Sequence, residues 1–556
     1  MALTLGQAGS AMWRLIGDGS LSTPGRAFPT AGERAHAPAV WGYVLSASVV
    51  LAVLGLLGHR LRRSLRGWQA GSPLARERGT LARHARDRGW VAQRTWATPE
   101  DLRRLWVGAP VTGRPYLGQI GRGRVRMLAA EREVQSMVIA PPRAGKSSGF
   151  VVPWLLDHRG PALVLSTKRD IYDATVAFRS AIGRVWVYDP FGEADSAGFT
   201  PLIPARSWAG AIRVGEALAS AAHPDQANAA NEFWDKEAAS MLAPLLHAAA
   251  LSGAGMAQLL RWLDTRHFAD ALVVLKQAGA SAAANQLEGV GRRDERNRET
   301  TVMSALNLLR AYRYPELAQP GAGVLDPEVF LDGEASTIYV VAAAHDQEVL
   351  RPVILALITA TYETAVRRAR AGGALDPALL MAMDEAANIA PVRNLAAWLS
   401  QCGDHGILIA TIWQSIAQID QRYGRAARDA ICAACTAQVF IPPLAEPTSS
   451  GYLSELLGEE PIANANGGGV GERLSAGHAR AAQAPWLRQV PRGRAILVYR
   501  DLPPAIVRAP GWFEDPRFAL YRRMLELSPV SPRPAGRGQA SKGRWPRGRG
   551  EGQNTR

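Results

Sequence analysis

The sequence predicts an α/β protein in which a parallel β-sheet is interrupted by an all-α segment and preceded by one transmembrane helix. Short apolar runs, typical of buried strands, alternate with helical stretches on both sides of a long Ala/Leu-rich segment. A glycine-lysine-serine loop follows one of these runs, and an uncharged stretch of 22 residues lies near the N-terminus. At 556 residues, the chain is long enough to bury more than one core.

The charge balance is basic, with 64 Lys and Arg against 49 Asp and Glu and a formal net charge of +15. Such an excess favours polyanionic partners, and nucleic acid and anionic lipid headgroups both fit that description. Three cysteines occur, at Cys402, Cys432 and Cys435. One C-x-x-C without a second pair or neighbouring His ligands is a poor zinc signature, so we expect small buried thiols. The lack of a disulfide framework fits a cytoplasmic bulk.

The uncharged stretch is residues 37–58 (APAVWGYVLSASVVLAVLGLLG). As a helix it would span ~33 Å, enough to cross the hydrocarbon core of a bilayer. A buried core helix is one alternative, and a secretory signal peptide is disfavoured because the stretch starts late and runs long. The arginine cluster in the following HRLRRSLRGW marks the cytoplasmic flank. We therefore expect residues 1–36 to be extracytoplasmic, residues 37–58 to span the membrane once, and residues 59–130 to be a basic juxtamembrane connector.

Beyond the connector, seven apolar runs are predicted to be strands: residues 133–140, 161–166, 184–188, 337–342, 378–383, 407–412 and 495–499, the last of which closes the sheet. Strands that alternate with helices form parallel sheets, so residues 131–204 and 323–525 are predicted to make one α/β domain. Residues 205–322 have helical spacing and few strand signals, which predicts an inserted all-α domain. Residues 526–556, rich in Gly, Pro and Arg, are predicted to be a disordered basic tail.

The loop after the first predicted strand carries the clearest chemistry. Residues 140–147 (APPRAGKS) match the phosphate-binding pattern G-x-x-x-x-G-K-[ST], except that Ala140 replaces the first glycine. Backbone N–H groups and the N-terminus of the following helix cradle phosphates in such a loop, and Ala140 is tolerable if its φ stays negative. Lys146 would reach the β- and γ-phosphates of ATP, and the Ser147 hydroxyl would ligate Mg²⁺. The predicted nucleotide contacts are Ala140, Pro141, Pro142, Arg143, Ala144, Gly145, Lys146, Ser147 and Ser148.

A second motif, residues 378–385 (ALLMAMDE), is an apolar strand that ends in two carboxylates. A buried strand of this kind can hold Asp384 where it joins the Mg²⁺ shell, while Glu385 polarises the attacking water. The simpler interpretation is that Asp384 only caps the following helix. Both roles can coexist, because ligands of open α/β sheets bind at the carboxyl ends of the strands.

A third strand end is polar as well, because Gln414 follows the run 407–412. Its amide could sense the γ-phosphate or orient water, and a purely local cap or hydrogen bond is the alternative. Arg422 and Arg425 lie just beyond and are candidates for an arginine finger that reaches a neighbouring subunit. Surface arginines are common, so this assignment rests on position alone.

Together these segments resemble the TraG-like coupling proteins, the conjugative ATPases of type IV secretion. The resemblance rests on residues 140–149, on Phe233-Trp234-Asp235 in the helical insertion and on residues 383–390 (MDEAANIA). It continues through residues 406–424 (GILIATIWQSIAQIDQRYG), where actinobacterial members are most similar, and residues 490–499 (VPRGRAILVY). It covers roughly residues 130–520.

The resemblance implies a RecA-like P-loop NTPase motor that carries an inserted all-α domain and works as a homo-hexamer around a DNA channel. It implies ATP and Mg²⁺ as cofactors, Lys146, Glu385 and Gln414 as catalytic residues, and Ser147 and Asp384 as metal ligands. Implied partners are DNA, expected to be single-stranded with an attached relaxase, the components of a type IV secretion channel, and the membrane. Two departures are Ala140 in place of glycine and one predicted span where many relatives have two.

The function predicted from these features is a membrane-anchored ATPase that recruits and pumps DNA or a DNA–protein complex into a type IV secretion channel. Three alternatives stay open. An FtsK-like double-stranded DNA translocase would be expected to carry a C-terminal winged-helix module, and this chain has a tail there instead. A protein-secretion ATPase would share every motor motif. A substrate receptor that does not hydrolyse ATP is disfavoured by Lys146, Asp384 and Glu385.

Overall fold

A computed structural model of the chain describes residues 96–121, 125–192, 196–221, 229–292, 294–318, 323–333, 335–389, 391–463, 476–480 and 484–527. The predicted extracytoplasmic segment, the predicted span 37–58 and most of the predicted connector lie outside the described residues, as do residues 528–556 of the predicted tail. The sheet, its helices and the candidate site all belong to the described ranges.

The centre of the fold is a 12-stranded sheet with the order β1-β3-β2-β14-β13-β10-β4-β9-β8-β5-β7-β6. Seven neighbouring strands are parallel: β10 (Ala437–Phe440), β4 (Ser136–Ile139), β9 (Ile407–Trp413), β8 (Leu379–Asp384), β5 (Ala162–Ser166), β7 (Thr337–Val341) and β6 (Val185–Tyr188). Almost every residue in them is buried, as expected for parallel strands covered on both faces. The predicted α/β fold with a parallel core is therefore confirmed.

Five further strands extend this sheet in antiparallel fashion: β13 (Arg494–Tyr499), β14 (Leu502–Arg508), β2 (Tyr116–Ile120), β3 (Arg126–Ala129) and β1 (Trp106–Val107). This extension differs from the prediction in two ways. Residues 106–129 were assigned to the connector, but they form three strands of the sheet. The predicted closing strand, β13, lies inside the sheet between β10 and β14. β1, β2 and β3 are short and mix polar with apolar residues, so they lack the continuous apolar signal of the central parallel strands.

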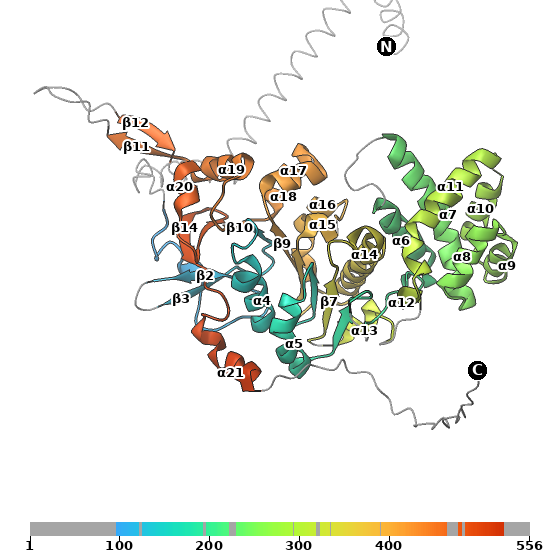
Figure 1. Cartoon of the computed structure of the whole chain (residues 1–556), viewed down its shortest axis with the longest axis horizontal. Helices are drawn as coiled ribbons and strands as arrows, with labels where there is room; N and C mark the ends of the chain where they lie inside the picture. The colour runs from blue at the N-terminus through green and yellow to red at the C-terminus, as the bar shows by residue number, and fades with distance from the viewer. Residues whose placement is uncertain are drawn as a thin grey trace, which may run out of the picture. The chain divides into compact units, whose positions relative to one another are not determined.

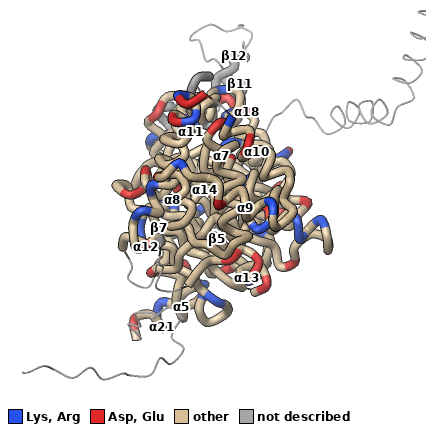
Figure 2. The backbone as a smooth tube through the Cα atoms, turned by 90° about the vertical axis from the view of Figure 1, so that its right-hand side faces the viewer, with Lys and Arg blue, Asp and Glu red and all other residues tan. Residues whose placement is uncertain are grey.

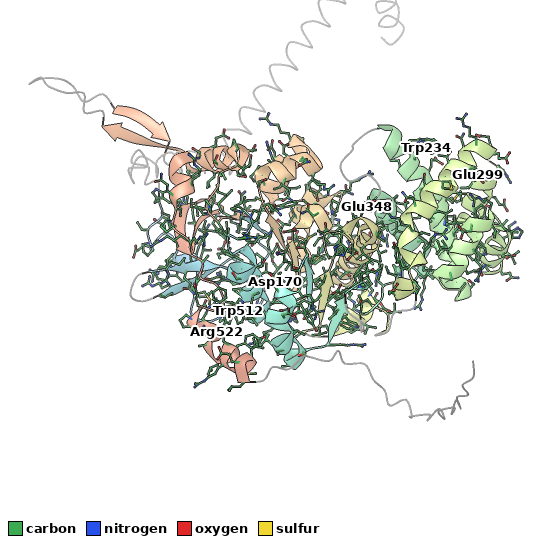
Figure 3. The ribbon with its side chains drawn as sticks, in the orientation of Figure 1. Asp170, Trp234, Glu299, Glu348, Trp512 and Arg522 are labelled. Carbon is green, nitrogen blue, oxygen red and sulfur yellow. The ribbon has the colours of Figure 1, made fainter. Side chains whose placement is uncertain are left out.

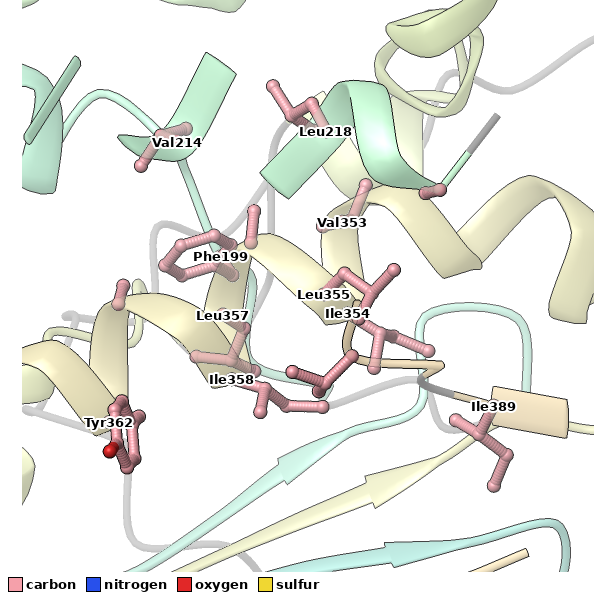
Figure 4. Packing of buried hydrophobic residues seen from close by; sticks show 14 of the residues in the cluster. Phe199, Val214, Leu218, Val353, Ile354, Leu355, Leu357, Ile358, Tyr362 and Ile389 are labelled. Atoms are coloured by element: carbon pink, nitrogen blue, oxygen red, sulfur yellow. The ribbon is translucent and has the colours of Figure 1, made fainter. Parts of the chain in front are cut away.

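Helices cover both faces of the parallel part, and strand residues alternate between two cores. Met137 and Ile139 of β4 pack on the core that contains α14 (Gln347–Gly372), whereas Val138 packs on the core that contains α4 (Val152–Asp157). α5 (Asp170–Ile182) contributes to the second core. Figure 4 shows α14 above the strands, with Phe199, Val214 and Leu218 packed over it.

The inserted domain is helical throughout its described residues. It contains α6 (Trp208–Ser220), α7 (Ala229–Ser252), α8 (Met256–Thr265), α9 (Ala269–Gln277), α10 (Ser281–Gly291), α11 (Glu295–Leu308), η7 (Arg310–Arg313) and α12 (Pro315–Ala318). Ser207 begins the domain as the N-cap of α6, where its hydroxyl accepts a hydrogen bond from the Gly210 N–H at 3.1 Å. These helices form the right-hand part of Figure 1, and Figure 3 labels Trp234 and Glu299 within them.

The remaining described elements connect the sheet or lie at its ends. They are η4 (Arg103–Leu105), η5 (Ser147–Val151), η6 (Pro204–Arg206), α13 (Pro327–Asp332), α15 (Ala386–Ile389), α16 (Leu395–Gln401), η8 (Gly403–His405), α17 (Ile416–Tyr423), α18 (Arg425–Ala434), α19 (Pro447–Leu457), β11 (Glu459–Ala463), β12 (Ala476–Arg480), α20 (Ala484–Gln489), η9 (Pro516–Phe518) and α21 (Ala519–Leu527). β11 and β12 form a separate antiparallel hairpin.

Among the described helices, only α14 has the length and apolarity to cross a membrane. Its most apolar window is 72% buried, and the helix packs between the sheet and α6. We therefore interpret α14 as a core helix of the domain. The predicted anchor is a different segment, residues 37–58, which lies outside the described residues.

The basic excess of the chain lies outside residues 96–527. Residues 1–95 contain 13 Lys and Arg against 4 Asp and Glu, and residues 528–556 contain 7 against 1. Residues 96–527 are consequently balanced, with 44 of each sign. Figure 2 shows basic and acidic residues interspersed along the backbone of this part.

Candidate nucleotide site

The loop after β4 begins in the core of the sheet. Ala140 is fully buried, and its N–H donates to the Trp413 carbonyl at the end of β9 at 2.9 Å. Ala140 is not among the described residues with a positive φ, so the missing glycine costs no backbone strain here. The two left-handed positions in the loop are Arg143, with φ 64°, and Gly145, with φ 88°. Only the second of these is occupied by the residue type that adopts this conformation freely.

The rest of the loop turns outward and then enters a helix. Pro142 and Arg143 are exposed, and the Ala144 N–H donates to the Pro141 carbonyl at 3.3 Å. The helix starts as η5 at Ser147 and continues as α4. Ser148 Oγ donates to the Gly145 carbonyl at 3.3 Å. A helix N-terminus thus directly follows the loop, in the arrangement that binds phosphates.

Lys146 lies against the two carboxylates at the end of β8. Its Nζ is 3.3 Å from Asp384 Oδ1 and 3.2 Å from Glu385 Oε1, across 238 and 239 residues of sequence. The Lys146 side chain is 11% exposed, that of Asp384 7% and that of Glu385 20%. The loop lysine and the strand-end carboxylates, predicted separately from sequence, are therefore brought together in one nearly buried cluster.

Ser147 and Asp384 form the second contact between the loop and β8. Ser147 Oγ donates to Asp384 Oδ2 at 2.9 Å. The other carboxylate oxygen, Oδ1, is buried, and its described polar neighbour is the Lys146 ammonium at the ion-pair distance of 3.3 Å. Burial raises the pKa of Asp384, and the Lys146 charge and the Ser147 hydrogen bond oppose that rise. One oxygen of Asp384 is thus left for a further ligand.

Glu385 sits on a strained turn between β8 and α15, with φ 55°. Both oxygens of the Glu385 carboxylate accept hydrogen bonds from side-chain amides, those of Gln414 and Asn388. Oε1 accepts from Gln414 Nε2 at 3.4 Å, in addition to its contact with Lys146, and Oε2 accepts from Asn388 Nδ2 at 3.4 Å. β9 lies between β4 and β8, which is why Gln414, the residue after β9, reaches Glu385. The predicted site residue Gln414 therefore does contact the predicted catalytic carboxylate.

Two amides that were not predicted from the sequence complete this network. Gln418 Oε1 accepts from the Gln414 N–H at 3.0 Å, and Gln418 Nε2 donates to Asn388 Oδ1 at 3.4 Å. Gln418 therefore connects both amides that contact Glu385. The available sequence signals were helical spacings: Asn388 is three residues after Glu385, and Gln418 is four after Gln414.

The two arginines suggested as fingers have different positions in the structure. The Arg422 Nε donates to the Ala387 carbonyl of the same chain at 2.8 Å, which ties α17 to the turn after β8. Arg425 is exposed at the start of α18. Neither contacts Lys146 or Asp384 within the described network.

The cysteines are buried, in keeping with the sequence interpretation. Burial raises the pKa of Cys432 to about 11 and that of Cys402 to about 12, and it raises that of Cys435 as well. Thiols of this kind stay protonated and are poor metal ligands. Within the described part of the chain, no group of three or more His, Cys, Asp or Glu side chains could hold a metal ion by itself.

A strand-loop-helix with a GKS sequence, facing a strand that ends in two carboxylates, defines the P-loop NTPases, and this molecule has both parts in contact. A family profile described as "Type IV secretory system Conjugative DNA transfer" matches residues 111–524. The chain therefore belongs to the conjugative DNA transfer family of type IV secretory systems, which confirms the resemblance to TraG-like coupling proteins.

Among the similar proteins is the conjugal transfer protein TraG of Escherichia coli, 23% identical over 358 residues, which cover 59% of this chain and 55% of TraG. The chain thus matches about half the length of this curated relative. The solved bacterial conjugative coupling protein TrwBΔN70, in its unbound monoclinic form, has a TM-score of 0.57 at 16% identity, with 74% of this chain and 92% of that chain covered. TrwB with ADP and Mg²⁺ has a TM-score of 0.55 at 16% identity, with 75% and 93% covered. These structures show a shared fold.

Proposed function

We propose that this protein is a membrane-anchored ATPase that recruits DNA, or a DNA–protein complex, and pumps it into a type IV secretion channel. The observation that carries the proposal is the cluster of Lys146, Ser147, Asp384, Glu385 and Gln414 at the carboxyl edge of the sheet. Ligands of α/β sheets bind at this edge. Membership in the conjugative DNA transfer family supplies the class of substrate.

In this proposal the loop from Ala140 to Lys146 and the start of η5 bind the phosphates of ATP. Phosphates would take the place of the carboxylates as partners of Lys146, whose ammonium is within reach of the loop. The plasmid coupling protein TrwB has been solved with ADP and Mg²⁺ and with a non-hydrolysable ATP analogue. The shared fold makes the same nucleotide the natural ligand for this site.

Mg²⁺ would be held by Ser147 Oγ and Asp384, and the donor set fits this ion. Two oxygens already lie 2.9 Å apart, and Asp384 Oδ1 is buried without a hydrogen bond. Mg²⁺ is commonly bound by one or two protein oxygens together with phosphates and waters, so a dedicated cage of three carboxylates is not needed. When bound, the ion would neutralise charge on the phosphate oxygens.

Glu385 is the proposed acceptor of the proton from the attacking water. Its carboxylate is 20% exposed, and the amides of Asn388 and Gln414 fix both of its oxygens. A positioned carboxylate next to the phosphate loop is suited to orient water and take up its proton. In this proposal Gln414 lies between the carboxylate and the phosphate loop and reports on the γ-phosphate, as its place after β9 suggests.

The wider assembly completes the proposal. Residues 37–58 anchor the chain as a single-pass membrane protein with its bulk in the cytoplasm, and the basic residues that follow face the headgroups. Six copies surround a channel that admits single-stranded DNA with its relaxase, and the type IV channel receives it. The neutral charge of residues 96–527 implies that DNA contacts in the motor come from local groups rather than from a basic surface.

Steady-state ATP hydrolysis by the full-length protein tests the proposal. We expect Mg²⁺-dependent hydrolysis that single-stranded DNA stimulates and that Lys146→Ala and Glu385→Gln abolish. Stimulation by double-stranded DNA alone would favour an FtsK-like translocase, and hydrolysis indifferent to DNA would favour protein export. If the parent protein binds ATP but does not hydrolyse it, even at concentrations that allow hexamers to form, the result would favour a substrate receptor and contradict the proposed motor function.

A further inference from the structure

A polar pocket lies next to the candidate nucleotide site, and it is lined in part by Asn388, which also contacts Glu385. It has a volume of about 280 Å³, many times the ~10–15 Å³ that one ordered water needs. Helices α14, α15 and α17 form it, at the carboxyl ends of β7, β8 and β9. Its polar lining consists of Gln347, Arg351, Asn388, Gln418, Gln421 and Arg422.

The lining has the composition of an anion site. It presents two guanidinium groups and four amides, and none of the described residues that line it is acidic. Glu348, in the first turn of α14 and labelled in Figure 3, pairs with Arg310 at 2.7 Å, and the hydrogen bond and charge of Arg310, together with the charge of Arg351, lower its pKa. The two guanidinium groups and four amides supply the pocket mainly with hydrogen-bond donors. Arginine forks and amides match the oxygens of phosphate.

The walls of the pocket are held in place by contacts to the sheet edge. Gln347 is 9% exposed and donates from Nε2 to the carbonyl of Ala342, directly after β7, at 3.2 Å. Arg422 is tied to the carbonyl of Ala387 at 2.8 Å. The pocket is therefore built from side chains with fixed anchors, which is the condition for a specific polar site.

One wall of the pocket is also part of the nucleotide site. Asn388 lines the pocket, and the same side chain donates to Glu385 Oε2 at 3.4 Å and accepts from Gln418 at 3.4 Å. Gln418 in turn accepts from the N–H of Gln414 at 3.0 Å. A ligand that draws on Asn388 or Gln418 would change the hydrogen bonds that orient the catalytic carboxylate.

We propose that this pocket binds a phosphate group, and that its occupancy is transmitted through Asn388 and Gln418 to Glu385. The inference deepens the proposed function, because a backbone phosphate of single-stranded DNA is one source of the ligand. A nucleotide phosphate is the other, since the chemistry that recognises it is the same. With the DNA source, the pocket couples the presence of substrate to the geometry of hydrolysis.

The test measures the binding of two ligands to the full-length protein. The first is a fluorescein-labelled single-stranded oligonucleotide, titrated by anisotropy at several salt concentrations, and the second is Mg²⁺-ADP. Arg351→Gln removes one guanidinium from the pocket, and Arg351→Lys keeps the charge but not the fork. Arg370→Gln, an exposed arginine at the other end of the same helix, is the matched control. Thermal unfolding curves confirm that each variant is folded.

We expect Arg351→Gln to bind the oligonucleotide about tenfold more weakly, with a salt slope smaller by about 0.7 for each phosphate that the guanidinium neutralises in the parent protein. Arg351→Lys should retain most of that slope, and Arg370→Gln should match the parent protein. Weaker ADP binding with unchanged DNA binding would assign the phosphate to a nucleotide. If Arg351→Gln matches Arg370→Gln for both ligands, the pocket does not bind phosphate. Failure of the parent protein to hydrolyse ATP would instead overturn the proposed function, while these binding measurements would still decide the pocket.

Discussion

Lys146 lies at ion-pair distance from two carboxylates, and this arrangement predicts a cost in stability for removing its charge. Its Nζ lies 3.3 Å from Asp384 and 3.2 Å from Glu385. Lys146→Met keeps the length and apolar stem of the side chain but removes the charge. We predict that this variant is less stable than the parent protein without nucleotide and Mg²⁺, because two neighbouring carboxylates are left without their common counter-ion.

The magnitude follows from the burial of the three groups. Removing one partner of a buried ion pair typically costs about 3–5 kcal/mol. The side chains here are 11%, 7% and 20% exposed for Lys146, Asp384 and Glu385, so solvent screens part of the repulsion at Glu385. We therefore expect a loss of about 2–4 kcal/mol near neutral pH.

The stability lost in Lys146→Met should also depend on pH. Burial already raises the pKa of Asp384 above its unfolded value, and loss of the lysine should raise it further. A group with a raised folded-state pKa binds more protons in the folded than in the unfolded state, so acidification through that pKa stabilises the folded state. The deficit of Lys146→Met should accordingly shrink as the pH falls from neutral, because a protonated Asp384 needs no counter-ion.

Urea unfolding of the nucleotide-free protein in EDTA, at neutral and at mildly acidic pH, measures this effect. The control is Lys276→Met, which removes a lysine 58% exposed and 2.7 Å from Glu288, and should change the stability far less than Lys146→Met because solvent screens this surface pair. The double variant Lys146→Met/Asp384→Asn should be more stable than additivity predicts. Equal stability of Lys146→Met and the parent protein at neutral pH would refute the two ion pairs of Lys146.

Three further predictions follow from other contacts. Arg179→Met should lower the free energy of unfolding by about 3–5 kcal/mol, because the fully buried guanidinium donates to Thr337 Oγ1 at 2.6 Å and to several backbone carbonyls. Urea unfolding measures this loss, and a variant as stable as the parent protein would contradict the prediction. Burial lowers the pKa of His158 from 6.5 to about 3, so unfolding should become easier by about 2 kcal/mol between pH 6.5 and 5, and His158→Gln should lose this part of the acid sensitivity. Asn388→Ala should lower kcat for ATP hydrolysis about tenfold and reduce its stimulation by DNA, because Glu385 loses a hydrogen-bond donor. The affinity for ADP should stay within about twofold of the parent's, because the phosphate loop is unchanged. A loss confined to ADP affinity would argue against this positioning role.

The parallel core could be predicted from sequence because its signal is local. Each of its central strands is a run of apolar residues buried on both faces, such as β8 and β9, and such runs stand out between helical stretches. β10, a parallel strand of four residues (AQVF), was missed because it is too short to be distinguished from the end of a helix. Of the antiparallel strands, β13 was predicted, and β1, β2, β3 and β14 were missed for another reason. β2 contains Gly118 at φ 124°, whose absent Cβ leaves room for Val507 of β14, and such pairings across about 390 residues leave no local pattern.

Part of the candidate site could be predicted from the sequence. Lys146, Ser147 and Asp384 belong to motifs whose spacing predicts their chemistry, and the structure brings these side chains into contact. The roles of Asn388 and Gln418 depend on the left-handed turn at Glu385, which has no sequence signature because non-glycine residues rarely adopt it. The finger assigned to Arg422 rested on position alone, and the structure shows this side chain bonded within its own chain.

The central claim is that ATP turnover at Lys146 and Glu385 moves DNA. Displacement of streptavidin from one end of a biotinylated single-stranded oligonucleotide by the full-length protein tests it most directly. We predict displacement with ATP, none with a non-hydrolysable analogue, and none by Lys146→Ala or Glu385→Gln. Displacement that survives Glu385→Gln, or vigorous DNA-stimulated hydrolysis that never displaces streptavidin from either end, would contradict it.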